Sequence, residues 1–384
     1  MAGAISCPLI FSERIVAPPT SYIDSVETPQ LPDHHGLDSL TLPQVLQHYR
    51  VPALSVAVIR DFRIHWAKAY GVADRVSAVA AETDTLFQAA SISKPVAAML
   101  VMKAIQDDYF GLYDDVFSVL KSWCPAETTF TRTGKVTPLS LMSHTSGLGD
   151  GYGYPGYPPG SALPSLLQIL NGEAPCNVGA TRFHRSPMSA WQYSGAGYTI
   201  LQLLLEEVYR QPFATLLHQQ VLSPLNMTRS GFDDSVAQQQ EQNRARGHDM
   251  AGQSMPHKWH RYPEQAAAGL WTTASDLAQF MIELQRSLHG QSNLVLSRNT
   301  IQAMATPVGV GDYAAGFAME KQGDGWYLTH HGDNVGFKGW ICGHKQKGYG
   351  CVLLCNGDNG VGVIREVTSR IQRVYEWALP RPRE

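Results

Sequence analysis

Ser91 and Lys94 stand three residues apart at the start of an apolar segment, and this spacing suits nucleophilic chemistry. The segment Val96–Ile105 is long enough for a buried helix, which places both side chains on one face at the helix mouth. A serine hydroxyl becomes a good nucleophile when a neighbour takes its proton, and a lysine can do so when burial lowers its pKa. Free N–H groups at the helix start are donors for an oxyanion. An N-capping serine followed by an ordinary lysine is the simpler alternative, so the rest of the chain must decide.

Two further clusters can complete such a site. Tyr193 lies in a turn before a predicted helix, and beside a cationic lysine we expect its pKa to fall, which makes it a second proton-transfer group. A surface-loop tyrosine is the alternative. His330, Gly332 and Asp333 end a predicted strand, where the glycine allows a substrate to approach closely. We expect the N–H groups of Asp333 and Ser91 to form an oxyanion hole, and His330 to bind a substrate group or donate a hydrogen bond to it.

The composition narrows the class of protein. With 384 residues, 44% hydrophobic and 16% charged, the chain is long enough for one large domain or two intimate ones. The formal net charge of -3, without long charged runs, gives no reason to expect nucleic acid or an anionic membrane surface as a partner. No apolar run has the length of a transmembrane helix, and Met1–Phe11 lacks the features of a signal peptide. The six cysteines form no Cys-x-x-Cys pair, which favours reduced thiols and a cytoplasmic location, with export left open.

The elements around these clusters predict an α/β fold of the α+β type. Strands are predicted near both ends of the chain and helices between them, so one sheet should be built from the two termini and interrupted by a helical domain. The predicted strands are Ser55–Ile59, Ile64–Ala69, Trp326–His331, Lys338–His344 and Gly350–Asn356. The predicted helices include Thr199–Tyr209, Phe213–Val221, Ala268–Gln285 and Val363–Trp377. We therefore expect an N-terminal arm (1–37), a sheet domain (38–90 and 265–384) and a helical domain with cleft-lining loops (91–264).

Two loop regions need separate interpretation. The loop Gly151–Gly160 carries Tyr152, Tyr154 and Tyr157, which either pack on the protein's own surface or form the wall of a substrate cleft. His257 and His260, with His248 upstream, have a metal-like spacing, but no carboxylate or cysteine cluster accompanies them, so we expect no metal site.

Together these segments resemble the serine β-lactamase and penicillin-binding-protein superfamily over residues 38 to 375. Ser91-Ile92-Ser93-Lys94 looks like the family's Ser-x-x-Lys, Tyr193-Ser194-Gly195 like its Tyr-x-Asn, and His330-His331-Gly332 like its Lys-Thr-Gly or His-x-Gly strand. Further landmarks match in the right order: Ser143–Leu148, Pro224–Met227 and Ala268–Leu277. The resemblance implies a β-lactamase/transpeptidase-like fold with a mainly antiparallel sheet, catalytic Ser91, Lys94 and Tyr193, and no metal or organic cofactor.

Two departures from that pattern decide the expected substrate. The class C β-lactamases have asparagine where this chain has Gly195 and lysine where it has His330, and both would contact a substrate. A largely neutral histidine loses most of the attraction for a carboxylate. We therefore expect a serine hydrolase of small esters with neutral acyl groups. The alternatives are a D-stereospecific peptidase or amidase, a β-lactamase-like hydrolase, an acyltransferase using the same acyl-enzyme, and a catalytically silent binding or scaffold relative. The oligomeric state is left open.

Overall fold

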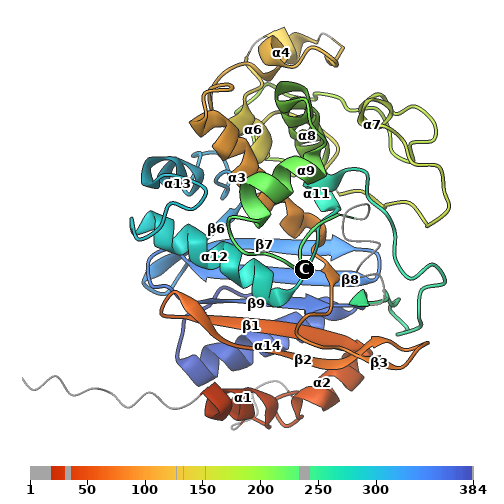
Figure 1. Cartoon of the computed structure of the whole chain (residues 1–384), viewed down its shortest axis with the longest axis vertical. Helices are drawn as coiled ribbons and strands as arrows, with labels where there is room; N and C mark the ends of the chain where they lie inside the picture. Colours follow the sequence, from red (N-terminus) through yellow and green to blue (C-terminus); the bar gives the residue numbers. More distant parts are fainter. Residues whose placement is uncertain are drawn as a thin grey trace, which may run out of the picture.

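A seven-stranded sheet, assembled from both ends of the chain, organises the computed structural model, which describes residues 19–30, 36–126, 128–132, 134–151, 153–232 and 243–382 (Figure 1). Neighbouring strands pair antiparallel throughout, which confirms the predicted sheet class. In spatial order the strands are β3 (Val79–Ala80), β2 (Arg63–Asp74), β1 (Ala53–Arg60), β9 (Gly350–Cys355), β8 (Phe337–His344), β7 (Gly325–Asn334) and β6 (Ala318–Gln322). The N-terminal hairpin thus lies directly beside the last strand of the chain.

The central strands form because their residues suit burial on both faces. β1 reads ALSVAVIR, and every residue before Arg60 is buried. The tight turn into β2 places Asp61 and Phe62 at φ values of 53° and 58°, the left-handed pair that matches the twist of a two-residue hairpin. This hairpin lies where the sequence predicts it.

Helices cover both faces of the sheet. On one face lies α12 (Ala274–Leu288); on the other lie α14 (Gly360–Tyr375), α1 (Pro19–Glu27) and α2 (Leu42–Tyr49) (Figure 1). α14 is amphipathic: Val363, Val367 and Ile371 recur at helical spacing and are fully buried against the sheet. The two faces hold separate apolar clusters, so the sheet is buried on both sides.

A helical region lies beyond the β6 edge of the sheet (Figure 1). Its central helix is α3 (Ser93–Gln106), preceded by a short 3-10 turn, Ala90–Ile92, and buried at almost every position from Ser93 to Ala104. The other helices of the described residues are α4 (Val116–Val119), α5 (Thr129–Arg132), α6 (Pro138–Met142), α7 (Leu166–Asn171), α8 (Ala196–Tyr209), α9 (Phe213–Leu217) with the π-helical η2 (His218–Leu222) after it, α11 (Gln265–Ala268) and α13 (Arg298–Met304). β4 (Phe87–Gln88) precedes the Ser91 turn and pairs with β5 (Trp271–Thr272) in a two-stranded ribbon. Among the described residues, no helix has the length and apolar character needed to cross a membrane.

Three elements differ from the predicted ones. Residues 19–27, expected as part of an irregular arm, form α1, which packs on α14. The single helix expected over Ala268–Gln285 is divided into α11, β5 and α12, because Gly269 ends α11 and Trp271 pairs in the ribbon. The edge strand β6 reads AMEKQ and is half exposed, so it has no apolar alternation from which to predict it. The polar residues 233–248 also predict a connection between helices, and most of that stretch lies outside the described residues.

Candidate active site

Ser91 and Lys94 lie at the junction of the 3-10 turn and α3. Ala90, immediately before the serine, has a φ of 51°, a left-handed conformation that a non-glycine residue adopts at a cost of about 1–3 kcal/mol. This turn brings Ser91 out of the buried helix. The Lys94 side chain is fully buried, with Nζ 3.1 Å from Ser91 Oγ and 2.8 Å from the carbonyl oxygen of Ala267. The amine is therefore held within proton-transfer distance of the hydroxyl.

The ionisation of Lys94 suits a proton acceptor. Burial lowers its pKa to about 7, and the negative charge of Asp150 acts in the opposite direction. The ammonium also lies 5.0 Å from the ring centre of Tyr193 and 5.6 Å from that of Tyr198. Near neutral pH a large fraction of Lys94 is therefore the neutral amine.

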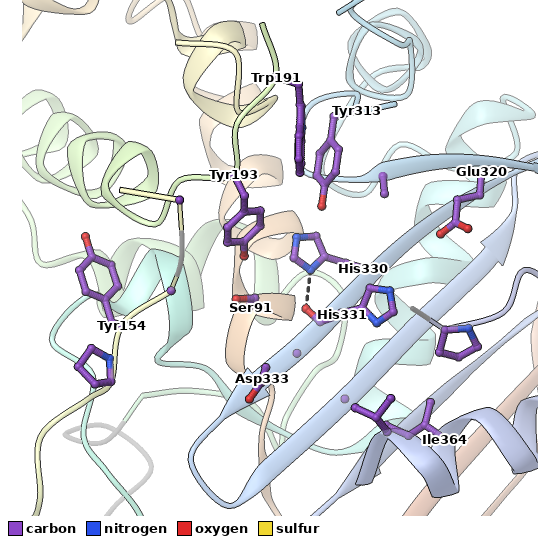
Figure 2. Close-up of a pocket in the computed structure, with 18 residues that line it drawn as sticks. Ser91, Tyr154, Trp191, Tyr193, Tyr313, Glu320, His330, His331, Asp333 and Ile364 are labelled. Atoms are coloured by element: carbon purple, nitrogen blue, oxygen red, sulfur yellow. Dashed lines mark hydrogen bonds between the residues drawn. The ribbon is translucent and has the colours of Figure 1, made fainter. Parts of the chain in front are cut away.

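Tyr193 lies above Ser91, and its hydroxyl points toward the Ser91 side chain (Figure 2). The expected lowering of its pKa is wrong: burial raises the pKa of Tyr193 well above its usual value. Desolvation of a phenolate outweighs the nearby lysine, whose own charge is partly lost. Tyr193 therefore stays protonated at neutral pH, and it can pass a proton on as a hydroxyl but does not act as a standing phenolate base.

The segment that carries Tyr193 is held by Asp150, a residue that we did not single out from the sequence. Its carboxylate accepts hydrogen bonds from Ser194 Oγ at 2.5 Å, the Gly195 N–H at 2.7 Å and the Ala196 N–H at 3.1 Å. These groups form the first turn of α8, where free N–H groups favour an anion. Asp150 follows the Ser143–Leu148 landmark, whose presence is the one signal that could have pointed to it.

His144, within the same landmark, supports Tyr193 from the other side. Its Nδ1 accepts a hydrogen bond from the Ser194 N–H at 3.1 Å, and its ring lies 4.3 Å from the Tyr193 ring. Burial lowers the pKa of His144 well below its usual value, so the ring is neutral. Asp150 and His144 together fix the phenol over the serine.

The end of β7 forms the opposite wall. β6 pairs with β7 only from Gly325 to Thr329, and the next stretch, from His330 to Asp333, borders the cavity beside Ser91. A Cβ atom on Gly332 would lie 2.4 Å from the Ala89 carbonyl oxygen. Glycine is therefore required for β7 to lie against the Ser91 turn. Asp333, the next residue, lies beside the serine (Figure 2).

His330 is 2% exposed and has a fixed arrangement of its two nitrogens. Nδ1 lies 2.7 Å from the His331 carbonyl oxygen, which can only accept, so Nδ1 carries the hydrogen. Burial, with a further contribution from the charge of Lys94, lowers the pKa of His330 to about 3. Nε2 is consequently a bare acceptor. The neutral charge agrees with the sequence-based expectation, but the hydrogen bond that His330 was expected to donate to a substrate is already given to His331.

Ser91, Tyr193, His330 and Asp333 line one cavity of about 690 Å³ (Figure 2). The cavity also contains an aromatic pair, Trp191 and Tyr313, with ring centres 5.4 Å apart, and the carboxylate of Glu320. Sequence reasoning missed Tyr313 and Glu320, because nothing in their neighbourhood indicates a site and only the fold brings them to Ser91.

The three tyrosines predicted on the loop have different positions. Tyr154 lines the cavity, and its hydroxyl lies 2.8 Å from Thr199 Oγ1. Tyr157 is buried elsewhere, and its hydroxyl accepts a hydrogen bond from the Asn177 N–H. Tyr152 lies outside the described residues. Gly195, also predicted to contact substrate, is the N-cap of α8; its N–H donates to Asp150, and it is not among the described residues that line the cavity.

Comparison with known proteins identifies the family. A Beta-lactamase family model matches residues 40–372, so the chain belongs to this family and to the superfamily of serine β-lactamases and penicillin-binding proteins.

Individual relatives are distant. Protein flp of Staphylococcus aureus is 22% identical over 317 residues, covering 81% of this chain and 60% of that protein. The chain thus spans about three fifths of the length of such curated relatives. The octameric penicillin-binding protein homologue from Pyrococcus abyssi has a TM-score of 0.70 at 19% identity, covering 88% of this chain and 78% of its own. D-alanine carboxypeptidase AmpC from Burkholderia cenocepacia has a TM-score of 0.66 at 19% identity, covering 92% of this chain and 99% of its own. At these identities the likeness shows the fold.

Proposed function

We propose that this protein hydrolyses carboxylic esters with neutral acyl groups through an acyl-enzyme on Ser91. The observation that carries the proposal is the buried Lys94 amine, 3.1 Å from Ser91 Oγ, with a pKa lowered to about 7. A purely structural role for Lys94 would not require a neutral amine. A neutral amine at this distance is what a serine needs to become a nucleophile.

The proposed reaction uses the residues around that pair. Ser91 Oγ attacks the ester carbonyl carbon while its proton passes to Lys94 Nζ. The N–H groups of Ser91 and Asp333 stabilise the oxyanion. The C–O bond to the alcohol then breaks, and the Tyr193 hydroxyl hands a proton to the departing alkoxide and regains one from Lys94. Water attacks the resulting acyl-enzyme, its proton returns along the same groups, and the acid leaves as Ser91 is restored.

The charge of the cavity supports neutral rather than carboxylate-bearing substrates. No lysine or arginine is among the described residues that line it, and His330 is neutral because its pKa is about 3. A substrate carboxylate would therefore lose its hydration without gaining a cation. The second candidate is hydrolysis of D-amino-acid peptides or amides, which the D-alanine carboxypeptidase among the structural neighbours suggests. Acyl transfer to an alcohol or amine ranks third.

One experiment tests the class and ranks the substrates. Folded protein is treated with a fluorophosphonate, and the labelled residue is found by mass spectrometry; Ser91→Ala is the control. Label on Ser91 supports the proposal, whereas an unlabelled Ser91 would favour a silent binding relative. The protein is then assayed with p-nitrophenyl acyl esters, D-aminoacyl anilides and nitrocefin, with and without a nucleophilic acceptor. We expect ester turnover to dominate and to fall by about 10⁴-fold or more in Ser91→Ala. Faster anilide or nitrocefin turnover would reverse the ranking.

A further inference from the structure

Trp191 presents an exposed aromatic ring to the cavity beside Ser91. All eight tryptophans of the chain lie among the described residues, and two of them are exposed, Trp191 at 39% and Trp326 at 44%. Trp191 lines the cavity, whereas Trp326 is not among the described residues that line it. Tryptophan has a large apolar surface to bury, so an exposed ring inside a cavity indicates a surface that a ligand covers.

The position of the Trp191 ring is fixed from several sides. Gly311 has a φ of 68°, and a Cβ atom there would lie 2.6 Å from Trp191 Cβ, so the backbone of this loop packs directly against the tryptophan. The Tyr313 ring centre lies 5.4 Å away, and the His144 ring meets Trp191 edge-on at 6.3 Å. The next residue, Gln192, donates its N–H to the His144 carbonyl oxygen at 2.8 Å. Trp191 is therefore held in place before a ligand arrives, which lowers the entropy cost of binding to it.

The ring is separated from the reacting atoms by one further layer of side chains. Tyr313 lies between, because its ring centre is 6.3 Å from that of His330 and 5.4 Å from that of Trp191. Figure 2 shows Trp191 and Tyr313 side by side above Ser91. The cavity of about 690 Å³ holds much more than an ester group. A substrate whose carbonyl carbon meets Ser91 Oγ therefore reaches Trp191 with a group that is a few bonds away from the carbonyl.

The chemistry of this wall favours another aromatic ring. The faces of aromatic rings carry partial negative charge and their edges partial positive charge, so two rings attract each other in offset or edge-to-face arrangements. A saturated ring of the same size buries its surface without this attraction. Trp191 and Tyr313 together thus favour an aromatic group over an aliphatic one.

We propose that the preferred substrates of this site are esters that carry an aromatic ring on a short chain, and that Trp191 is the residue that selects them. This inference rests on the proposed ester hydrolysis. The ring can belong to the acyl part or to the alcohol part of the ester. The chemistry of recognition is the same for both, and the experiment separates the two positions.

The test uses pairs of esters that match in size and differ in aromaticity. For the acyl part, methyl 3-phenylpropanoate is compared with methyl 3-cyclohexylpropanoate. For the alcohol part, 2-phenylethyl acetate is compared with 2-cyclohexylethyl acetate. The ratio of kcat/KM within each pair is measured from the acid released by wild type, Trp191→Leu and Trp191→Phe. Because cyclohexyl is the more apolar group, burial alone favours it over phenyl.

We expect wild type to prefer the phenyl member of one pair, and the pair that shows the preference places the ring in the acyl or the alcohol part. Trp191→Leu should reduce this preference by about twofold to tenfold. Trp191→Phe keeps an aromatic face and should retain most of it. A loss of preference as large in Trp191→Phe as in Trp191→Leu would overturn the inference, because the aromatic face is then not the cause.

Trp326→Leu is the matched control, because it removes an exposed tryptophan of β7 from outside the described cavity lining. Its ratios should equal those of wild type. Ratios that stay unchanged in Trp191→Leu for both pairs would contradict the proposed role of Trp191. A wild-type preference for the cyclohexyl member of both pairs would contradict the proposed substrate class.

Binding to Ser91→Ala distinguishes failure of the inference from failure of the proposed function. This variant cannot form an acyl-enzyme, so the affinities of the four esters are measured by ligand-observed NMR without turnover. Tighter binding of the phenyl member of one pair supports the ring preference even if wild-type protein hydrolyses none of the four. If none is hydrolysed, equal or weaker binding of both phenyl members would refute the preference, even where Ser91 is labelled by the fluorophosphonate.

Discussion

Lys94 has the ionisation on which the proposed chemistry depends most directly. Its pKa is lowered to about 7 by burial, so the neutral amine that accepts the Ser91 proton becomes the main form as pH rises through about 7. We expect kcat/KM for a p-nitrophenyl ester to rise with pH, with a midpoint near 7, and then to level off. Neither neighbour should add a second step in this range, because the pKa of His330 is about 3 and that of Tyr193 is raised.

Lys94→Arg is the control for this profile. A guanidinium stays charged at every accessible pH, so the variant should lose about 10³-fold in kcat/KM and show no rise near pH 7. Rates are measured from initial velocities after subtraction of spontaneous hydrolysis. A wild-type profile that is flat from about pH 5 to about pH 9 would show that Lys94 is not the base.

For single residues, spacing in the sequence predicts which side chains come together better than it predicts their pKa values and tautomers. Ser91 and Lys94 are one helical turn apart, and that local relation is visible in the sequence. The pKa of Tyr193 depends on how deeply its ring is buried, which only the packing of β7 and α8 decides, so the expected direction was wrong. The tautomer of His330 depends on a carbonyl whose position no motif encodes.

Asp150, which binds the turn that leads into α8, affects the proposed proton transfer in two ways. Its carboxylate holds the Tyr193 segment, and its charge raises the pKa of Lys94. Asp150→Asn removes the charge and turns an N–H group toward donors. We expect kcat to fall about tenfold and the midpoint of the pH profile to move below its wild-type value, because Lys94 then loses its proton more readily.

The shift in midpoint separates this role from a loss of folding. Asp276→Asn is the matched control: Asp276 also accepts from a backbone N–H and a serine hydroxyl, those of Arg229 at 2.9 Å and Ser230 at 2.8 Å, but Lys94 is not influenced by it. Its midpoint should stay near 7. If both variants have the wild-type midpoint, the charge of Asp150 does not reach Lys94.

The approach of β7 to the Ser91 turn gives a second prediction for an element. Gly332→Ala would place a Cβ atom 2.4 Å from the Ala89 carbonyl oxygen, so strand and turn must move apart. We expect labelling of Ser91 by the fluorophosphonate to slow by about tenfold or more, because a displacement of this kind disturbs the oxyanion donors. Gly179→Ala, at a position with open space around it, should label at the wild-type rate. Equal rates in both variants would mean that the strand does not position the site.

Long periodic elements were predictable, and short or edge elements were not. The β1–β2 hairpin, α8, α14 and the strands β7 to β9 have runs of apolar residues long enough to define a period. β6 has five residues, two of them exposed and none in an apolar pattern, so Glu320 could not be placed at the cavity from sequence. α1 is polar on its outer face and gains its stability from α14, which lies more than three hundred residues away in the chain.

For the molecule as a whole, both termini must come together before the site exists. β1 pairs with β9, so the sheet that carries His330 is completed by the N-terminal hairpin. The sequence predicts this closure because strands occur at both ends of the chain. It does not predict what holds α1 and α2 to α14, because the contacts there join one side chain to carbonyl groups that are distant in the sequence.

Arg370 of α14 makes these contacts. Its side chain is fully buried; Nε donates to Glu366 at 2.7 Å, and the remaining guanidinium nitrogens reach carbonyl oxygens of the N-terminal segment. The accepting carbonyls are those of Val26, Thr28, Leu37 and Leu40, at 2.8 to 3.4 Å. One cation thus joins α14 to both ends of the segment between α1 and α2.

Arg370→Met should therefore destabilise the protein by about 3 kcal/mol or more, because a buried carboxylate and several carbonyls lose their donor together. Lys68→Met is the comparison: Lys68 also holds the N-terminal helix, through Glu27, but its side chain is 44% exposed, and its loss should cost under about 1 kcal/mol. Urea unfolding followed by fluorescence gives both values, and limited proteolysis should cut the N-terminal segment faster in Arg370→Met alone. Equal midpoints for the two variants would mean that apolar packing of α1 and α2, rather than the buried guanidinium, fastens this layer to the sheet.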